Sequence, residues 1–199
     1  MTAEHYIKES CLITAAGIFK NDELIFDNEG LQPSEFLLAA YKGLNLHYPK
    51  FYKMDVLSKL GWLCAEVLLQ NGSLSAYQPE EIAVITANSN ASLSADLNYA
   101  ETISSIASPA LFVYTLPSIV IGEICIRHGI KGENTFFVMD KFDADFMVEY
   151  VSGLMDGQTT NACICGWIEA LGDDAKAVLY LIEKKETSRE FTVTELNKD

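Results

Sequence analysis

Basic residues are scarce in this sequence. Lysine and arginine together number 14 among 199 residues, against 28 aspartates and glutamates, which leaves a formal net charge of −14. Nucleic-acid binding depends on Lys and Arg side chains that neutralise phosphates, and an anionic membrane surface attracts proteins through the same residues. The composition therefore argues against both nucleic acid and membrane as partners.

Long apolar runs and an export signal are also missing. The N-terminal residues 1–8 lack the basic and then apolar pattern of a signal peptide. The longest mostly apolar stretch, residues 110–126, contains Pro117 and Glu123, so it is too short and too polar to span a bilayer. Without an export signal, an odd number of cysteines predicts reduced, buried thiols and a cytoplasmic protein. The five cysteines are Cys11, Cys64, Cys125, Cys163 and Cys165.

Familiar catalytic and cofactor-binding signatures are absent as well. The sequence contains no G-x-x-x-x-G-K-[ST], G-x-G-x-x-G, G-x-S-x-G or H-E-x-x-H motif. Its three histidines, His5, His47 and His128, lie far apart in the sequence. Each is interpreted as a surface residue or a satisfied core residue rather than a general base. No cofactor is predicted.

Two groups of residues could suggest a metal or carboxylate site, and both have a simpler interpretation. Cys163 and Cys165 would face the same side of a strand, but a metal site needs further ligands that the neighbouring sequence does not supply. Core packing is the preferred interpretation of this pair, and no metal is predicted. The acidic residues between positions 140 and 149 fit the start of a helix, where the helix dipole favours negative charge. They are Asp140, Asp143, Asp145 and Glu149.

Apolar residues, in contrast, make up 49% of the sequence, and no repeat or linker divides it, so residues 1–199 are expected to form a single domain. The clearest helix spans residues 53–70, where apolar side chains recur every three or four positions. Residues 82–87 predict a buried parallel strand, and the small, polar residues 88–94 predict a loop. The other expected elements are a hairpin of 11–19 with 24–26, helices over 33–43, 118–128 and 142–155, and strands over 134–139, 162–168 and 178–182.

This order of elements predicts an α/β domain in which helices pack on a mixed sheet. Truncation of a large aliphatic residue in such a core is expected to destabilise the protein by about 2–5 kcal/mol. The core is expected to contain Leu12, Ile13, Leu60, Cys64, Val84, Ile85, Val138, Cys163, Cys165 and Leu179.

A resemblance takes the interpretation further. Residues 108–118 read Ser-Pro-Ala-Leu-Phe-Val-Tyr-Thr-Leu-Pro-Ser, and they are followed by Gly122-Glu123-Ile124 and by Gly129-Ile130-Lys131-Gly132. This order resembles the β-ketoacyl synthase family, in which a similar run leads to the nucleophile strand. The resemblance implies a thiolase-like layered fold, with this chain as the N-terminal one of two similar halves. Further pieces in the family's order are Lys53-Met54-Asp55, residues 79–85 and residues 166–170.

The chain departs from the family at the catalytic residues. The resemblance places the attacking Cys about nine residues after the second Gly of the Gly-x-x-Gly turn; that position here is Lys141, between Asp140 and Phe142. No Cys lies between Cys125 and Cys163. Claisen condensation needs a thiolate to carry the acyl chain, whereas a lysine amine would form a stable amide. The family's two catalytic histidines come from its second half, so this chain is not expected to be active alone.

The family includes nucleophile-less homologues, the chain-length factors, which pair with an active ketosynthase and shape the pocket for the growing chain. The resemblance therefore implies a non-catalytic subunit of this kind in bacterial polyketide, aryl-polyene or fatty-acid-like synthesis. One alternative is a ketosynthase-like scaffold with an unrelated role. Another is a decarboxylase or acyltransferase that uses Lys141, which would need a buried lysine with a destabilised ammonium. The adjacent Asp140 would work against that.

The partner is expected to be a full-length ketosynthase, in a heterodimer, or a second copy of this chain. Half of a two-half fold leaves apolar surface uncovered, so strand 134–139 and helix 117–127 are predicted to form the interface, and residues 115–123 a pocket wall. An acidic acyl carrier protein would be repelled by the charge of −14 and is expected to engage only the ketosynthase. The predicted pocket and interface residues are Thr115, Pro117, Ser118, Ile121, Phe136, Val138 and Phe142.

Overall fold

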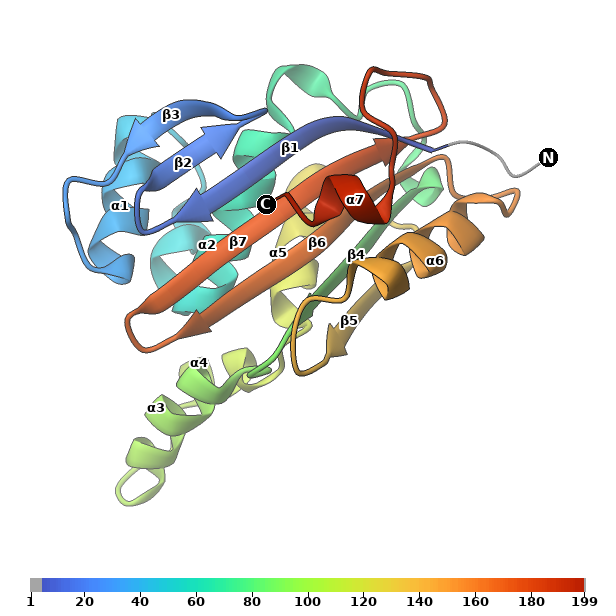
Figure 1. The fold of residues 1–199 in the computed structure, drawn as a ribbon. Coiled ribbons are helices and arrows are strands. Elements are labelled where there is room, and N and C mark those ends of the chain that lie inside the picture. Colours follow the sequence, from blue (N-terminus) through green and yellow to red (C-terminus); the bar gives the residue numbers. More distant parts are fainter. Residues whose placement is uncertain (1–4, 199) are drawn as a thin grey trace.

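The computed structural model describes residues 5–198, which form one seven-stranded sheet with helices on both of its faces (Figure 1). The strands are β1 (Tyr6–Thr14), β2 (Gly17–Lys20), β3 (Glu23–Asp27), β4 (Ile82–Asn88), β5 (Asn134–Val138), β6 (Ala162–Leu171) and β7 (Asp174–Glu183). The helices are α1 (Pro33–Gly43), α2 (Val56–Leu68), α3 (Leu93–Ile103), α4 (Pro109–Phe112), α5 (Ile119–His128), α6 (Ala144–Met155) and α7 (Val193–Leu196).

The strand order across the sheet is β3-β2-β1-β7-β6-β4-β5. β4 runs parallel to both β5 and β6, and β7 runs antiparallel to β6 and β1. The carboxyl ends of β1, β4, β5 and β6 therefore meet at one edge of the sheet. In mixed and parallel sheets the segments that follow such ends are a common place for a functional site.

Alternation along the central strands divides the core into two layers. Every residue of β4 is buried, and its side chains alternate between the faces: Val84 packs with α2 and α5, whereas Ile85 packs with α6. A strand buried on both faces reads as a continuous apolar run. This is why residues 82–87 were recognisable as a parallel strand from the sequence alone.

Helices α1, α2 and α5 cover the first face of the sheet (Figure 1). The Asp55 side chain caps α2 by accepting a hydrogen bond from the Ser58 backbone N–H at 3.1 Å. Gly61 allows α5 to approach closely, because a Cβ atom there would lie 2.3 Å from Val120 Cγ2 and 2.8 Å from Ile168 Cδ1. The small residue therefore sets the distance between α2, α5 and β6.

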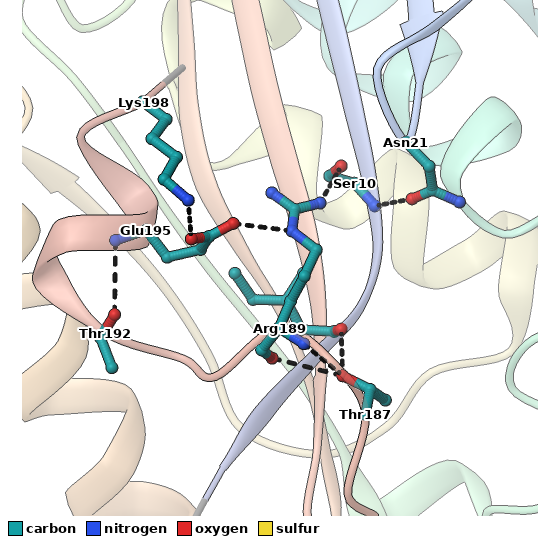
Figure 2. Close-up of polar contacts among 8 residues, drawn as sticks. Ser10, Asn21, Thr187, Arg189, Thr192, Glu195 and Lys198 are labelled. Atoms are coloured by element: carbon teal, nitrogen blue, oxygen red, sulfur yellow. Dashed lines mark hydrogen bonds and ion pairs between the residues drawn. The ribbon is translucent and has the colours of Figure 1, made fainter.

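Helix α6 and the C-terminal segment with α7 cover the second face. Figure 2 shows how polar contacts hold that segment: the Arg189 guanidinium donates to Glu195 Oε1 at 2.9 Å and to Ser10 Oγ at 2.8 Å. Lys198 pairs with the same Glu195 carboxylate, and these two cations hold the pKa of Glu195 below its usual value. Leu196 is thereby placed in the second core layer.

The predicted α/β class, with helices on a mixed sheet, is confirmed, and the predicted helices and strands are all present with shifted ends. Residues 11–19, however, are not one strand, because a turn at Ala15 and Ala16 separates β1 from β2. The predicted loop 88–94 is also too long, since α3 begins at Leu93 and continues to Ile103. All five cysteines lie within residues 5–198 and form no disulfide there; four are buried and Cys125 is half-buried.

One predicted core residue is wrong. Val138 is 56% exposed, because β5 lies at the edge of the sheet, with β4 on one side. Leu12 is only half-buried, and it packs against the second core layer. The other predicted core residues are buried: Ile13, Leu60, Cys64, Val84, Ile85, Cys163, Cys165 and Leu179.

No single helix among residues 5–198 is long and apolar enough to cross a membrane. By length and composition alone, Pro109–Thr115 and Ile119–His128 meet that criterion as a pair, with a bend of 96° between them.

Candidate functional site

The position predicted for the family nucleophile lies at a junction between a strand and a helix. Lys141 is exposed in the turn that leaves β5 after Val138 and enters α6 at Ala144. Asp143 caps the helix by accepting a hydrogen bond from the Phe146 backbone N–H at 2.9 Å. The cysteines lie elsewhere, on β1, α2, α5 and β6, and burial raises the pKa of the Cys165 thiol well above its usual value.

A cavity of about 320 Å³ opens beside Lys141 at the edge where the parallel strands end. Its walls come from the segments after β4 and β5, from β6 and β7, and from α7. None of the three histidines, all of which lie within the described residues, lines it. The lining residues are Ser89, Asp140, Lys141, Phe142, Trp167, Glu169, Lys176, Val178 and Leu196.

Ser89 and Glu169 form the polar wall of this cavity. Glu169 Oε2 accepts hydrogen bonds from the Ser89 backbone N–H at 2.7 Å and from Ser89 Oγ at 2.5 Å. Asn90 Nδ2 donates to Ser89 Oγ at 2.9 Å. Because one carboxylate oxygen holds both the amide and the hydroxyl of Ser89, the pair anchors the segment after β4 to the end of β6. The sequence prediction missed this pair, whose members lie 80 residues apart.

Phe142 is the one predicted pocket residue that lies with Lys141. It lines the cavity, and its ring packs edge-on against Trp167 with the centroids 6.1 Å apart. Thr115, Pro117, Ser118 and Ile121 do not line the cavity. Ile121 lies on α5, which packs on the opposite face of the sheet, and the other three residues lie in the segment that leads into this helix. The structure therefore divides the predicted site between two places.

The prediction that α5 lacks cover is wrong. Val120, Ile121 and Ile124 are buried in the first core layer, where α2 and the sheet of this same chain cover them. Cys125 is half-buried. The α5 side chains that face the core therefore need no partner to cover them, whereas Ile126 on the same helix is 66% exposed.

Two buried carboxylates form ion pairs that hold α5 against its neighbours. Glu123 pairs with Lys50 Nζ at 2.7 Å. Glu66, on α2, accepts two hydrogen bonds from the Arg127 guanidinium, at 2.7 Å and 2.9 Å, and His128 Nε2 lies 3.1 Å from its Oε1. Burial opposes ionisation of Glu66, but His128 and Arg127 outweigh burial and hold its pKa below the usual value. Buried charges persist when they are paired in this way.

Strand β5 presents the other half of the predicted interface. Phe136 is half-buried on the α5 side and Phe137 on the α6 side, where its ring contacts Phe146 and Tyr150 at centroid distances of 4.9 Å and 5.0 Å. Within residues 5–198, β4 is the single strand that pairs with β5. The outer edge of β5 thus offers free backbone groups and the exposed Val138 side chain to an incoming strand.

A scan against protein-family models finds no match for this sequence, and a search of curated proteins finds none either. Solved structures do match. The ishigamide ketosynthase/chain length factor superposes with a TM-score of 0.70 at 15% identity, over 94% of this chain and 64% of that one. A ketosynthase (ApeO) in complex with its chain length factor (ApeC) from Xenorhabdus doucetiae gives 0.59 at 14% identity, over 92% and 79%.

A third match is AntDE:AntF, a type II PKS acyl-carrier protein in complex with its ketosynthase, with a TM-score of 0.64 at 11% identity. It covers 92% of this chain and 63% of that one. This chain therefore has the thiolase-like α/β fold that ketosynthase and chain length factor structures share. It spans somewhat less than two thirds of the ishigamide and AntDE:AntF chains, at 64% and 63%.

Proposed function

We propose that this chain is a non-catalytic ketosynthase-like subunit, which pairs with an active ketosynthase and shapes the pocket that holds the growing acyl chain. The observation that carries the proposal is the exposed Lys141 at the β5–α6 junction, beside a cavity that no cysteine or histidine of this chain lines. A carbon–carbon bond-forming condensation needs a thiolate that accepts the acyl group and later releases it. An amide formed by lysine would not release it.

The solved structures of similar fold support a ketosynthase as partner, since two of them pair a ketosynthase with a chain length factor. In this proposal the subunit serves bacterial polyketide, aryl-polyene or fatty-acid-like synthesis. The free edge of β5 is the surface that would pair with the ketosynthase in a heterodimer. Residues 115–123 would contribute a wall of the shared pocket.

The enzyme alternative loses support from the same geometry. A lysine nucleophile needs an environment that destabilises its ammonium, and burial is the usual means. Lys141 is exposed. A decarboxylase or acyltransferase centred on Lys141 therefore lacks the burial that would activate the amine.

The test is reconstitution with the ketosynthase encoded nearest to this gene. We expect the ketosynthase to make no product of defined length alone, and to do so when this chain is added. Replacing the ketosynthase's own active-site Cys by Ala should abolish the product, whereas Lys141→Ala in this chain should leave the yield unchanged. Detection by intact mass of a stoichiometric acyl adduct between Met139 and Asp143 would contradict the proposal.

Titration with an acyl carrier protein tests whether the carrier binds the ketosynthase and not this subunit. Because the chain carries a charge of −14, an acidic carrier should show no saturable binding to the isolated subunit at low salt, where repulsion is least screened. Tight binding that weakens as salt is added would place a basic docking patch on this subunit, and the carrier would then not act through the ketosynthase alone.

A further inference from the structure

A second apolar surface lies away from β5 and from the Lys141 cavity. We call residues 93–116 the apolar arm; it contains α3, α4 and the helical turn Val113–Thr115. Figure 1 shows α3 and α4 projecting from the edge of the sheet, away from both helical layers. Fourteen large hydrophobic side chains of the described chain are exposed, and eight of them are in the arm. These eight are Leu93, Leu97, Ile103, Ile106, Leu111, Phe112, Val113 and Leu116.

The arm is a folded unit rather than a loose loop. The rings of Tyr99 and Phe112 pack with centroids 5.4 Å apart, which joins α3 to α4. Thr102 Oγ1 donates to the Tyr99 carbonyl at 2.7 Å and accepts from the Ser108 backbone N–H at 3.1 Å. These contacts fix the turn between the helices. The exposed side chains are therefore held on a defined surface.

The base of the arm is fastened to the rest of the molecule. Ser92 Oγ donates to the Thr115 carbonyl at 2.8 Å, which closes the two ends of the arm on each other. Ser94 Oγ donates to the Ala170 carbonyl at 3.2 Å, next to Glu169 in the cavity wall. A partner that holds the arm would therefore also be held against the edge of the sheet where the Lys141 cavity opens.

Charge limits what can cover this surface. The sequence has no Lys or Arg between Lys59 and Arg127, and the charged residues of the arm are Asp96 and Glu101. An anionic membrane would repel such a surface. A second copy of this chain, which also carries −14, would set like charges against each other. Apolar patches of this extent on a folded chain mark sites of association, and the charge favours a different, more basic protein.

We infer that the apolar arm inserts into an apolar groove rimmed by Lys and Arg on the ketosynthase partner. This rests on the proposed function, which supplies the ketosynthase as partner. The apolar side chains provide the buried contact area, and Asp96 and Glu101 pair with the basic rim. The arm is thus a second contact, separate from the β5 edge, and its acidic residues select for a partner of opposite charge.

The experiment measures the affinity of the purified ketosynthase encoded nearest to this gene for arm variants of the full chain. Ile106→Asp changes a side chain that is 87% exposed at the tip of the arm, and Leu24→Asp on β3, 53% exposed, is the matched control. We expect Ile106→Asp to weaken binding by at least about tenfold, as for a central interface residue. Leu24→Asp should bind as the unchanged chain does, and both should unfold at the unchanged temperature.

The charge part of the inference has its own variant. Asp96→Asn with Glu101→Gln should weaken binding several-fold at low salt and should match the unchanged chain at high salt, where the rim is screened. If this double variant and the unchanged chain bind equally well at low salt, the inference that the groove has a basic rim is overturned. Affinity of Ile106→Asp equal to that of the unchanged chain, or an equal loss in Leu24→Asp, would overturn the arm as a contact.

Two further outcomes separate this inference from the proposed function. If the unchanged chain binds no ketosynthase at all, the proposed function fails, and the inference fails with it. If light scattering shows that the isolated chain is a dimer and that Ile106→Asp makes it a monomer, a second copy covers the arm, and the inference alone is overturned.

Discussion

The apolar arm and α5 are neighbours in the sequence, and both are rich in apolar residues. Yet Ile121 on α5 is buried, whereas Ile106 in the arm is exposed. The difference is the cover: α2 and the sheet enclose α5, while the arm projects past the sheet edge (Figure 1). Apolar content indicates that a segment will be covered, but it does not tell whether the same chain supplies the cover.

The largest expected effect on stability comes from placing a negative charge on α5, compared with the same charge placed in the apolar arm. Ile121→Asp would bury an unpaired carboxylate in the first core layer, and we expect it to destabilise the protein by more than about 4 kcal/mol. Ile106→Asp, in solvent, should change the free energy of unfolding by less than about 0.5 kcal/mol. Urea unfolding followed by circular dichroism measures both. Similar losses in the two variants would mean that the arm packs on the body of the protein.

A smaller effect tests how closely α5 lies against α2. Gly61→Ala would place a Cβ atom 2.3 Å from Val120 Cγ2, and we expect a loss of about 1–3 kcal/mol from overpacking. Gly122→Ala is the control, because no atom lies within 4 Å of its Cβ position. On helix α5 that change should stabilise the protein by about 0.5–1 kcal/mol. A stabilising Gly61→Ala would contradict the close packing.

The smallest expected effect is the loss of stability at low pH when the ion pairs of Glu66 are removed. The pKa of Glu66 is lower in the folded protein than in the unfolded chain, so its ion pairs stabilise the fold at pH values above about 4.3, the ordinary value for Glu. That stabilisation is lost as the pH falls through the folded-state pKa. We expect Glu66→Gln to cost about 1–2 kcal/mol at neutral pH and progressively less as the pH falls below 4. A constant difference between the two proteins over this range would contradict the ion-pair role.

The pattern of neighbouring residues was sufficient to predict the central helices and strands of the fold. The three- and four-residue spacing in α2 and the continuous apolar run in β4 both come from residues that are neighbours in the sequence. The turn after Thr14 was missed because Ala15 and Ala16 are small and apolar and carry none of the usual turn residues. Helix α3 was missed because its apolar residues face solvent instead of a core.

The features that depend on distant residues could not be predicted in this way. Val138 is exposed because β5 is an edge strand, and no local signal gives the order of strands in a sheet. The Ser89–Glu169 pair joins residues 80 apart. The position of Lys141 came from a resemblance, and the structure places it at a strand–helix junction.

The position of β1 has a consequence for how the protein is made. Among the described strands β1 is synthesised first, yet in the sheet it lies between β2 and β7, with Ile13 paired to Ala177. Until β7 has been synthesised, one side of β1 lacks its partner strand, so the sheet cannot close before residues 174–183 have been made. Pairing over such a sequence separation is slow. The nascent chain therefore exposes the apolar strands of its centre for longer than those of its rim, and aggregation during synthesis should begin there.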